Sequence, residues 1–329
     1  MRNALLQLLL LMLAVHSPAA FARTLPRDAQ MTARSANDNT VYETWTDNSR
    51  HRQIPVKIYL PPNATPPYPI VIFSHGLGGS RDAAKYLGQY WSQHGYFCVF
   101  PQHVGSDSSV WEPARGTNRQ EFIRRMQVAA NGQNLVDRAH DVTFVIDELE
   151  RRNQTDPNLK GKLNLNAIAV AGHSFGAGTA LVAAGQKFGP GSQLEDKRVK
   201  SALYLCPPVM GGRMAGTYDD ITIPGMLLTG TEDNSMIRGT KAEDRRIPYD
   251  GIRAPHQYLV NFYGADHATF GGRSFRAPKE TDAEFHRLID GVTLKFLDAT
   301  LKNDPAAWQW LDGKGLTDFL GKTAAYERK

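Results

Sequence analysis

The sequence is poor in the features that mark several large classes of protein. Only two of its 329 residues are cysteine, which is too few for a disulfide framework or a Cys-x-x-Cys zinc site. It also lacks a His-Glu-x-x-His motif and a glycine-rich phosphate loop, so metal and nucleotide chemistry have no motif to support them. We therefore expect no metal and no cofactor.

The two cysteines, Cys98 and Cys206, each lie in an apolar stretch that predicts a strand. Two positions in the middle of parallel strands can be bridged only if the strands are neighbours. The expected strand order does not make them neighbours. Two buried free thiols are therefore favoured over a disulfide, although an exported protein would permit one.

A long run of charge of one sign is also missing. The chain has 38 basic and 33 acidic residues and a formal net charge of +5. The basic residues come in scattered pairs such as Arg124-Arg125 and Arg245-Arg246, without interleaved aromatic residues. We interpret each pair as part of a solvated face and expect no nucleic-acid partner. At most, the positive charge favours anionic surfaces or substrates.

The N-terminus has the pattern of a secretory signal peptide. Arg2 precedes an apolar stretch over residues 4–15, and Ala20-Phe21-Ala22 offers a small-x-small cleavage site. We expect residues 1–22 to be the signal peptide and residues 23–329 to form a single domain of an exported protein, periplasmic or secreted. No apolar stretch is long enough to predict stable membrane insertion. An uncleaved anchor or a buried helix is the alternative.

Strand and helix patterns alternate along the rest of the chain, after a polar segment over residues 23–40. The expected strands are residues 41–45, 56–60, 70–74, 97–100, 167–171, 202–205, 226–229 and 258–262. The expected helices are residues 82–93, 119–131 running on through 134–151, 175–187 and 282–301. The central strands are apolar throughout, which is typical of parallel strands covered on both faces. The pattern predicts an α/β fold with a doubly wound, mostly parallel, eight-stranded sheet.

One pentapeptide joins a predicted strand to a predicted helix. It is Gly172-His173-Ser174-Phe175-Gly176. Strand, Gly-x-Ser-x-Gly and helix in this order form the nucleophile elbow of α/β-hydrolases, a turn so sharp that side chains two residues either side of the serine would collide. The motif alone also arises by chance, so the flanking strand and helix are what make Ser174 the candidate nucleophile.

A serine hydroxyl needs a base that takes its proton. In this fold the base follows the acid along the chain, and both follow the serine. His267 comes just after the predicted strand 258–262, at the carboxyl end where ligands gather in such sheets. His256 opens that strand at its other end and His286 lies in the last predicted helix. His267 is therefore the candidate base, with a structural histidine as the alternative.

The acid that orients the base should follow an earlier strand at the same edge. Asp233 comes just after the predicted strand 226–229 and is the candidate acid. Glu232 is the neighbour that could replace it, and Asp219 or Asp220 would serve in an alternative topology. Asp266 precedes the base directly, and we expect it to point away or to cap its loop.

Two backbone N–H groups are expected to form an oxyanion hole, which stabilises the charge of the tetrahedral intermediate. One is the N–H of Phe175, the residue after the candidate nucleophile. The other is expected in the glycine-rich turn after the third predicted strand, where we assign the N–H of Leu77. A plain glycine turn is the alternative.

More than sixty residues separate the predicted strand 97–100 from the elbow strand. The part over residues 108–126, with Trp111 and Phe122, could cover the site as a small lid or substrate-binding wall, and ordinary helix packing explains it equally well. Trp111 is the candidate substrate contact. We expect His103 and Asp107 to line a loop near the mouth of the cleft, without assigning them as ligands.

Several motifs together resemble a known family. They are Val71-Ile72-Phe73-Ser74-His75-Gly76-Leu77-Gly78-Gly79, Pro101-Gln102-His103-Val104-Gly105-Ser106-Asp107, the elbow, and Asp266-His267. From about residue 41 to residue 301 the chain resembles predicted dienelactone hydrolases and the platelet-activating-factor acetylhydrolase type of α/β-hydrolase. The resemblance implies the α/β-hydrolase fold, Ser174, Asp233 and His267 as the triad, and no cofactor.

One departure bears on the substrate that the resemblance implies. Dienelactone hydrolases carry a cysteine nucleophile where this chain has Ser174. We therefore expect a serine esterase that acts on a small-molecule or lipid-like carboxylic ester. A phospholipid acetylhydrolase or polyester hydrolase working at an interface is one alternative, and a catalytically silent binding protein on the same scaffold is another.

Overall fold

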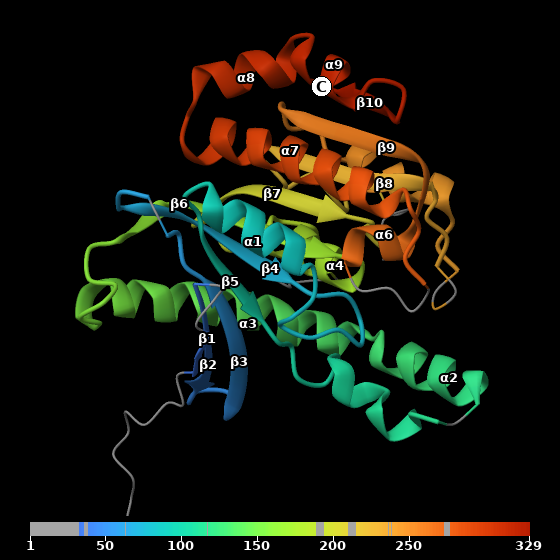
Figure 1. The fold of residues 1–329 in the computed structure, drawn as a ribbon. Helices are drawn as coiled ribbons and strands as arrows, with labels where there is room; N and C mark the ends of the chain where they lie inside the picture. Colours follow the sequence, from blue (N-terminus) through green and yellow to red (C-terminus); the bar gives the residue numbers. More distant parts are fainter. Residues whose placement is uncertain are drawn as a thin grey trace, which may run out of the picture. The chain divides into compact units, whose positions relative to one another are not determined.

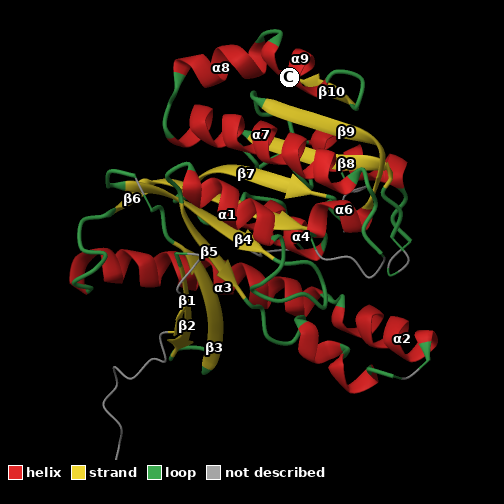
Figure 2. Cartoon of the chain, in the orientation of Figure 1, coloured by secondary structure: helices red, strands yellow, loops and turns green. Residues whose placement is uncertain are grey.

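A ten-stranded sheet forms the centre of the structure, which is a computed structural model (Figures 1 and 2). The structure describes residues 33–35, 39–62, 64–116, 118–188, 194–209, 215–235, 237, 239–272 and 277–329. These belong to one unit, Met31–Lys329. The expected signal peptide and most of the polar segment 23–40 lie outside the described residues.

The strands follow one another across the sheet in an order typical of a doubly wound fold. They are β1 (Ala33–Ser35), β2 (Thr40–Asp47), β3 (Arg52–Tyr59), β4 (Tyr68–Ser74), β5 (Phe97–Pro101), β6 (Leu163–His173), β7 (Val199–Leu205), β8 (Gly225–Glu232), β9 (Gln257–Asp266) and β10 (Ala324–Arg328). The order is β1-β2-β3-β5-β4-β6-β7-β8-β9-β10. The strands from β5 to β9 in that order are parallel, and antiparallel strands form both edges.

This arrangement confirms the predicted α/β-hydrolase fold and corrects its strand count from eight to ten. All eight predicted strands are present, as β2 to β9. The two additional strands are the edges. β1 has only three residues, and most of β10 is exposed or half-buried. Neither therefore has the continuous apolar run by which a buried strand is recognised.

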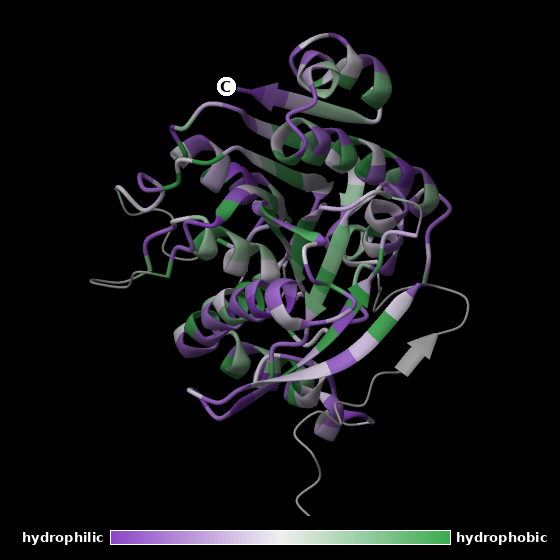
Figure 3. Cartoon of the chain, turned by 90° about the vertical axis from the view of Figure 1, so that its left-hand side faces the viewer, coloured by the Kyte–Doolittle hydropathy of each residue, from purple (hydrophilic) through white to green (hydrophobic). Residues whose placement is uncertain are grey.

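Helices cover both faces of the sheet (Figure 1). The core on one face includes α1 (Lys85–Gln93), α7 (Asp282–Leu301), α8 (Pro305–Asp312) and α9 (Gly315–Leu320), and the core on the other includes α3 (Gly132–Thr155) and α4 (Phe175–Ala183). In β4, Val71 and Phe73 join the first core while Ile70 and Ile72 join the second. Because both faces are buried, the strand is apolar throughout, and the hydrophobic colouring is strongest on the inner strands (Figure 3).

The predicted long helical region over residues 119–151 is two helices. α2 (Arg119–Ala129) ends before Asn131, whose side chain accepts a hydrogen bond of 2.8 Å from the Asn134 N–H and so caps α3. The remaining short helices, α5 (Ile247–Gly251) and α6 (His267–Gly271), were not predicted, and neither were α8 and α9. α7 has the predicted bounds.

Both cysteines are buried free thiols, as expected. Cys98 lies on β5 and Cys206 follows β7, with β4 and β6 between those two strands. The strand order therefore explains why the two thiols are not bridged. In the part of the chain that the structure describes, we find no helix with the length and apolarity needed to cross a membrane.

Candidate active site

Ser174 occupies a strained turn between β6 and α4. Its backbone has φ 56° and ψ −120°, a conformation that costs a non-glycine residue roughly 1–3 kcal/mol. A Cβ atom on Gly172 would collide with the backbone of Gly176, and one on Gly176 would collide with the carbonyl of Ser74. Both glycines are therefore required for β6, the turn and the end of β4 to approach one another.

Two side chains from neighbouring strand ends complete a hydrogen-bonded chain with Ser174. His267, just after β9, has Nε2 at 2.9 Å from Ser174 Oγ. Its Nδ1 lies 2.6 Å from Oδ1 of Asp233, which follows β8. Because a carboxylate only accepts hydrogen bonds, Nδ1 carries the ring proton, and Nε2 is left to accept the serine proton.

Asp233 is fully buried and is held by more than the histidine. Its Oδ2 accepts a hydrogen bond of 2.8 Å from the Thr229 hydroxyl. Nη2 of Arg245, from the 3₁₀ helix η3 (Ala242–Arg246), lies 3.0 Å from Oδ1. Burial alone would raise the pKa of Asp233, but the hydrogen bond from His267 and the charges of His267 and Arg245 outweigh it and lower that pKa. The carboxylate is thus kept ionised.

The other candidate acids lie in different settings. Glu232 is exposed and pairs with Lys279 at 3.5 Å. Asp266 accepts a hydrogen bond of 3.1 Å from the Thr269 N–H and caps α6, as expected. Asp219 and Asp220 lie in a turn that precedes β8, and they pair with Arg253 and Lys187 respectively. None of these contacts involves His267.

The other candidate histidines are bonded elsewhere too. His256 directly precedes β9, and its ring packs at a tilt against that of Trp308, with ring centroids 4.5 Å apart. His286 lies on α7, stacks on Tyr86 and has Nε2 at 2.8 Å from the Thr269 carbonyl. His256 and His286 therefore pack against residues away from Ser174, whereas His267 contacts Ser174 directly.

The loop after β4 fixes the direction of the Leu77 N–H. The carbonyl of Gly76 accepts a hydrogen bond of 2.7 Å from His75 Nδ1 and one of 3.0 Å from the Gly79 N–H. The peptide group between Gly76 and Leu77 is planar, so fixing this carbonyl also orients the Leu77 N–H in the opposite direction. Gly76 lies against the elbow, because a Cβ placed on it would be 3.4 Å from Ser174 Cβ.

A buried arginine joins this loop to the other candidate donor. Arg138, on α3, donates to the His75 carbonyl at 2.6 Å and to Ser106 Oγ at 2.8 Å. Its guanidinium carbon lies 4.7 Å from the centre of the Phe175 ring. Phe175 is the first residue of α4, where a backbone N–H has no acceptor within the helix. The two candidate oxyanion donors are therefore anchored through one side chain.

A second Ser–His–Asp chain lies beneath the loop, fully buried. Nε2 of His103 is 3.0 Å from Ser74 Oγ, and its Nδ1 is 3.0 Å from Asp141 Oδ2. The expectation that His103 and Asp107 line the mouth of a cleft is wrong, since they are 0% and 3% exposed. Burial, followed by the charge of Arg138, lowers the pKa of His103 to about 4. His103 is thus an uncharged structural group.

His173, the residue before the nucleophile, supports the base. Its Nε2 lies 3.0 Å from the His267 carbonyl, and burial, followed by the charge of His267, lowers its pKa to about 3. His173, Cys206 and His267 also bring possible metal ligands within 4.8 Å of one another. Nη2 of Arg245 lies 3.2 Å from His267 Nδ1, and a guanidinium so close disfavours a metal cation there.

Sequence reasoning missed two buried arginines that lie beside the site, Arg138 and Arg245. Arg245 was interpreted as part of a solvated face, and this is wrong, since it is 1% exposed while Arg246 beside it is exposed. No pattern along the chain distinguishes the two. Arg138 had a usable signal, because it lies three and four residues from Leu135 and Val142 on the apolar side of α3.

The segment over residues 108–126 packs against the oxyanion loop. Trp111 Nε1 donates to the Gly78 carbonyl at 2.7 Å. A Cβ atom on Gly78 would collide with both Trp111 and Met126. Trp111 therefore packs against the loop that carries the Leu77 N–H. A pocket of about 400 Å³ is lined in part by residues of this segment, Val110, Arg124 and Arg125.

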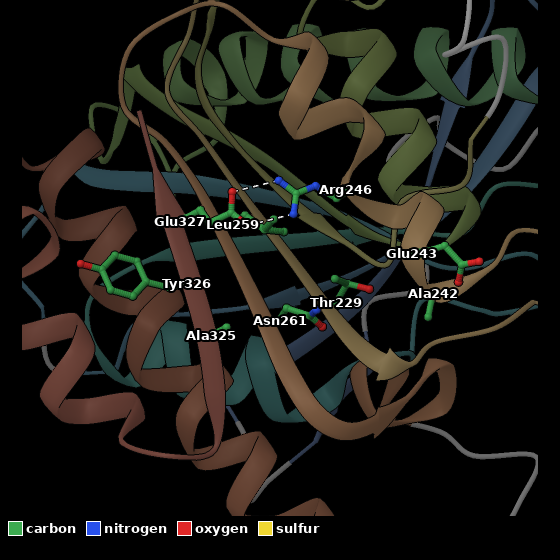
Figure 4. A pocket seen from close by; sticks show the side chains of 9 residues that line it. All are labelled: Thr229, Ala242, Glu243, Arg246, Leu259, Asn261, Ala325, Tyr326 and Glu327. Carbon is green, nitrogen blue, oxygen red and sulfur yellow. Dashed lines mark hydrogen bonds and ion pairs between the residues drawn. The ribbon is translucent and has the colours of Figure 1, made fainter.

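A second, smaller pocket is lined by residues of β8, β9 and β10, at one edge of the sheet (Figure 4). It measures about 80 Å³, and Arg246 and Glu327 form an ion pair at its rim. Thr229 lines it and also donates to Asp233. Since Ser174 does not line this pocket, we assign it no substrate.

Comparison with known proteins gives one family and two relatives. The family model "Platelet-activating factor acetylhydrolase, isoform II" matches residues 46–122, a segment that contains the oxyanion loop and ends before the elbow. A platelet-activating factor acetylhydrolase of Cavia porcellus is 28% identical over 177 residues, which are 47% of this chain and 38% of that protein. A Bos taurus protein of the same name is 25% identical over 35% of this chain and 31% of its own length.

The chain thus spans between about three and four tenths of the length of the relatives it matches. The resemblance to the platelet-activating-factor acetylhydrolase type of α/β-hydrolase, inferred from the motifs, is confirmed over these segments.

Proposed function

We propose that the protein is a serine hydrolase that cleaves carboxylic esters, with Ser174 as nucleophile, His267 as general base and Asp233 as the acid that orients the base. One observation carries the proposal: the hydrogen-bonded chain from Ser174 Oγ through His267 to Asp233, which begins at a strained elbow. Similarity to platelet-activating factor acetylhydrolases supports an ester hydrolase.

The chemistry follows from the proton positions. His267 Nε2 takes the Ser174 proton as Oγ attacks the ester carbonyl, and the imidazolium is held by Asp233. The N–H groups of Leu77 and Phe175 donate to the resulting oxyanion, a contribution of about 3 kcal/mol per donor. The imidazolium then protonates the leaving alcohol. Water, deprotonated by His267, hydrolyses the acyl-enzyme and restores Ser174.

A lipid-like ester cleaved at an interface is the second candidate, because both relatives are named platelet-activating factor acetylhydrolase. A polyester hydrolase would likewise have to act on its substrate at an interface. In either case Trp111 forms a wall of the substrate site, since it contacts the loop that carries Leu77. The signal-peptide pattern supports export, to the periplasm or out of the cell, and the reaction requires no cofactor.

The test is hydrolysis of p-nitrophenyl esters from acetyl to dodecanoyl by the wild type and by Ser174→Ala. We expect the variant to lose activity by a factor of about 10⁴ or more. The acyl-chain length that is cleaved fastest would then indicate the size of the acyl-binding site. A rise in rate above the solubility limit of the ester would favour the interfacial candidate.

A silent scaffold gives a different result in the same assay. Both proteins would then show equal rates near background, and a fluorophosphonate probe would leave Ser174 unlabelled, because such probes react only with an activated serine. That outcome would contradict the proposed activity.

A further inference from the structure

Arg245 makes a set of contacts that the proposed triad does not require. It is 1% exposed, and its Nη1 donates to the carbonyls of Cys206 at 3.0 Å and Pro207 at 2.9 Å. Its Nη2 lies 3.0 Å from Asp233 Oδ1 and 3.2 Å from His267 Nδ1. The guanidinium is thus anchored by backbone carbonyls, and its Nη2 donates to the Asp233 carboxylate while lying close to the protonated Nδ1 of His267.

This placement has a direct electrostatic consequence. When His267 takes the serine proton it becomes a cation between the Asp233 carboxylate and the Arg245 guanidinium. The carboxylate favours that cation and the guanidinium opposes it, and both act over about 3 Å in a site with little water to screen them. Arg245 therefore offsets part of the effect of Asp233 on the ring.

We propose that Arg245 is a positioning residue that holds Asp233 in place and keeps His267 unprotonated, and so active as a base, at a lower pH than Asp233 alone would allow. The inference rests on the proposed function of the same site.

The other titratable side chains that contact His267 carry no charge that could oppose its protonation. His173, at the end of β6, donates to the His267 carbonyl, and its lowered pKa leaves it neutral. Burial raises the pKa of the Cys206 thiol, after β7, well above its ordinary value, so it is neutral as well. The charges that face the ring from these elements are therefore those of Asp233 and Arg245.

Groups on the elements beside α6 are engaged with one another. Asp266 caps α6 and pairs with Lys279 at 3.0 Å, and Glu232 pairs with the same lysine. His286, on α7, contacts the Thr269 carbonyl. These pairs are common to the wild type and to every variant below.

The test compares Arg245→Gln and Arg245→Met, which remove the charge, with Arg245→Lys, which keeps it. The matched control is Arg246→Gln, which removes the same charge from the neighbouring exposed arginine, paired with Asp250 and Glu327. The measurement is the pH dependence, from pH 4.5 to 9, of kcat/KM for p-nitrophenyl acetate and of the rate constant for fluorophosphonate labelling. The labelling rate constant reports only folded, active molecules, so a partly unfolded variant still gives a profile.

We expect the acid limb of both profiles to move upward by about one pH unit in the two neutral variants. Arg245→Lys and Arg246→Gln should keep the acid limb of the wild type. A purely structural role would instead lower the rates equally at every pH.

Two results would overturn the inference. One is an unmoved or downward-moved acid limb in Arg245→Gln and Arg245→Met. The other is failure of both neutral variants to fold while Arg245→Lys is active, which would assign the residue to the fold. A wild type that is labelled at Ser174 but cleaves no ester would contradict the proposed function and leave the comparison of labelling profiles intact.

Discussion

The molecule contains two Ser–His–Asp chains whose hydrogen bonds are nearly the same. We call Ser174–His267–Asp233 the open set and Ser74–His103–Asp141 the buried set. The serine-to-histidine distances are 2.9 and 3.0 Å, and the histidine-to-aspartate distances are 2.6 and 3.0 Å. Each aspartate also contacts a buried or partly buried arginine.

The two sets differ in the solvent exposure of the histidine and in the backbone conformation of the serine. The His267 side chain is 26% exposed, whereas that of His103 is 0% exposed. Ser174 stands on a strained elbow at the start of a helix, while Ser74 is the last residue of a buried strand. A hydrogen-bonded triad is thus insufficient for catalysis, which also needs a substrate path and oxyanion donors.

The buried set has a mechanical role instead. It links the ends of β4 and β5 to α3, and the His103 N–H donates to His75 Nε2 at 3.0 Å. That bond leaves the His75 proton on Nδ1, from which it reaches the Gly76 carbonyl. The buried set therefore holds the loop that orients the Leu77 N–H.

Replacing the aspartate of each set should separate the two roles most strongly. We expect Asp233→Asn to lower kcat by about 10⁴, because the ring of His267 then adopts the wrong tautomer. Asp141→Asn should lower the activity per folded molecule far less, because Arg138 still donates to the His75 carbonyl in the oxyanion loop. It should lower the free energy of unfolding by about 3–5 kcal/mol, because it leaves Arg52 without its buried partner.

The measurements are steady-state kinetics, normalised by active-site labelling, and denaturant unfolding. Equal losses of activity in the two variants would contradict the distinction between the sets.

Arg138 connects the loop that the buried set holds to Phe175, beside Ser174. We expect Arg138→Met to lower kcat by about 10², with a smaller change in KM, because the His75 carbonyl and the Phe175 ring lose their common anchor and the oxyanion donors lose their position. Arg124→Met, which changes an exposed arginine on α2, is the control. A rise in KM with unchanged kcat would show that Arg138 does not serve the oxyanion donors.

The buried set should contribute to the pH dependence of stability through His103. His103 has a pKa of about 4 in the folded state and about 6.5 when unfolded. Between these values the imidazole of His103 binds a proton in the unfolded chain and not in the folded one. His103 therefore lowers the free energy of unfolding as pH is lowered, by at most about 1.4 kcal/mol per unit, and His173 adds a slope of the same sign.

Denaturant unfolding at pH 7 and pH 5 would measure this slope. His103→Gln should reduce the slope, whereas the exposed His94→Gln should leave it unchanged. Identical slopes in His103→Gln and the wild type would contradict the assignment of His103 as a buried neutral group.

We expect the smallest effect on activity at Trp111, which packs against the oxyanion loop. Trp111→Phe keeps an aromatic ring and loses the hydrogen bond to the Gly78 carbonyl, which contributes about 1 kcal/mol. A decrease of a few-fold in kcat/KM is expected, measured on one short and one long ester. Trp310→Phe, at a ring contact with Phe319, is the matched control and should leave kcat/KM unchanged. A loss as large as that of Arg138→Met would give Trp111 a greater role than the wall assigned here.

The sequence predicts the members of the open set because their order and their places at strand ends are visible along the chain. Ser174, Asp233 and His267 each follow an apolar run, and parallel strands bring such positions to one edge. Whether any of them reacts is a question the labelling and kinetic experiments answer.

The surroundings of these residues could not be predicted in the same way. Arg245 and Arg246 are adjacent and chemically identical, yet one is buried against Asp233 and the other is exposed. His103 pairs with Asp141 across 38 residues, a contact that depends on how α3 lies under the sheet. Burial of a polar side chain is a property of the assembled packing, and local patterns carry little of it.

The most direct test is to label the protein with a fluorophosphonate probe and to locate the modified residue by peptide mass spectrometry, in the wild type, Ser174→Ala and Ser74→Ala. We expect one label, on Ser174, which is lost in Ser174→Ala and retained in Ser74→Ala. A label on Ser74, or labelling that survives in Ser174→Ala, would contradict this expectation.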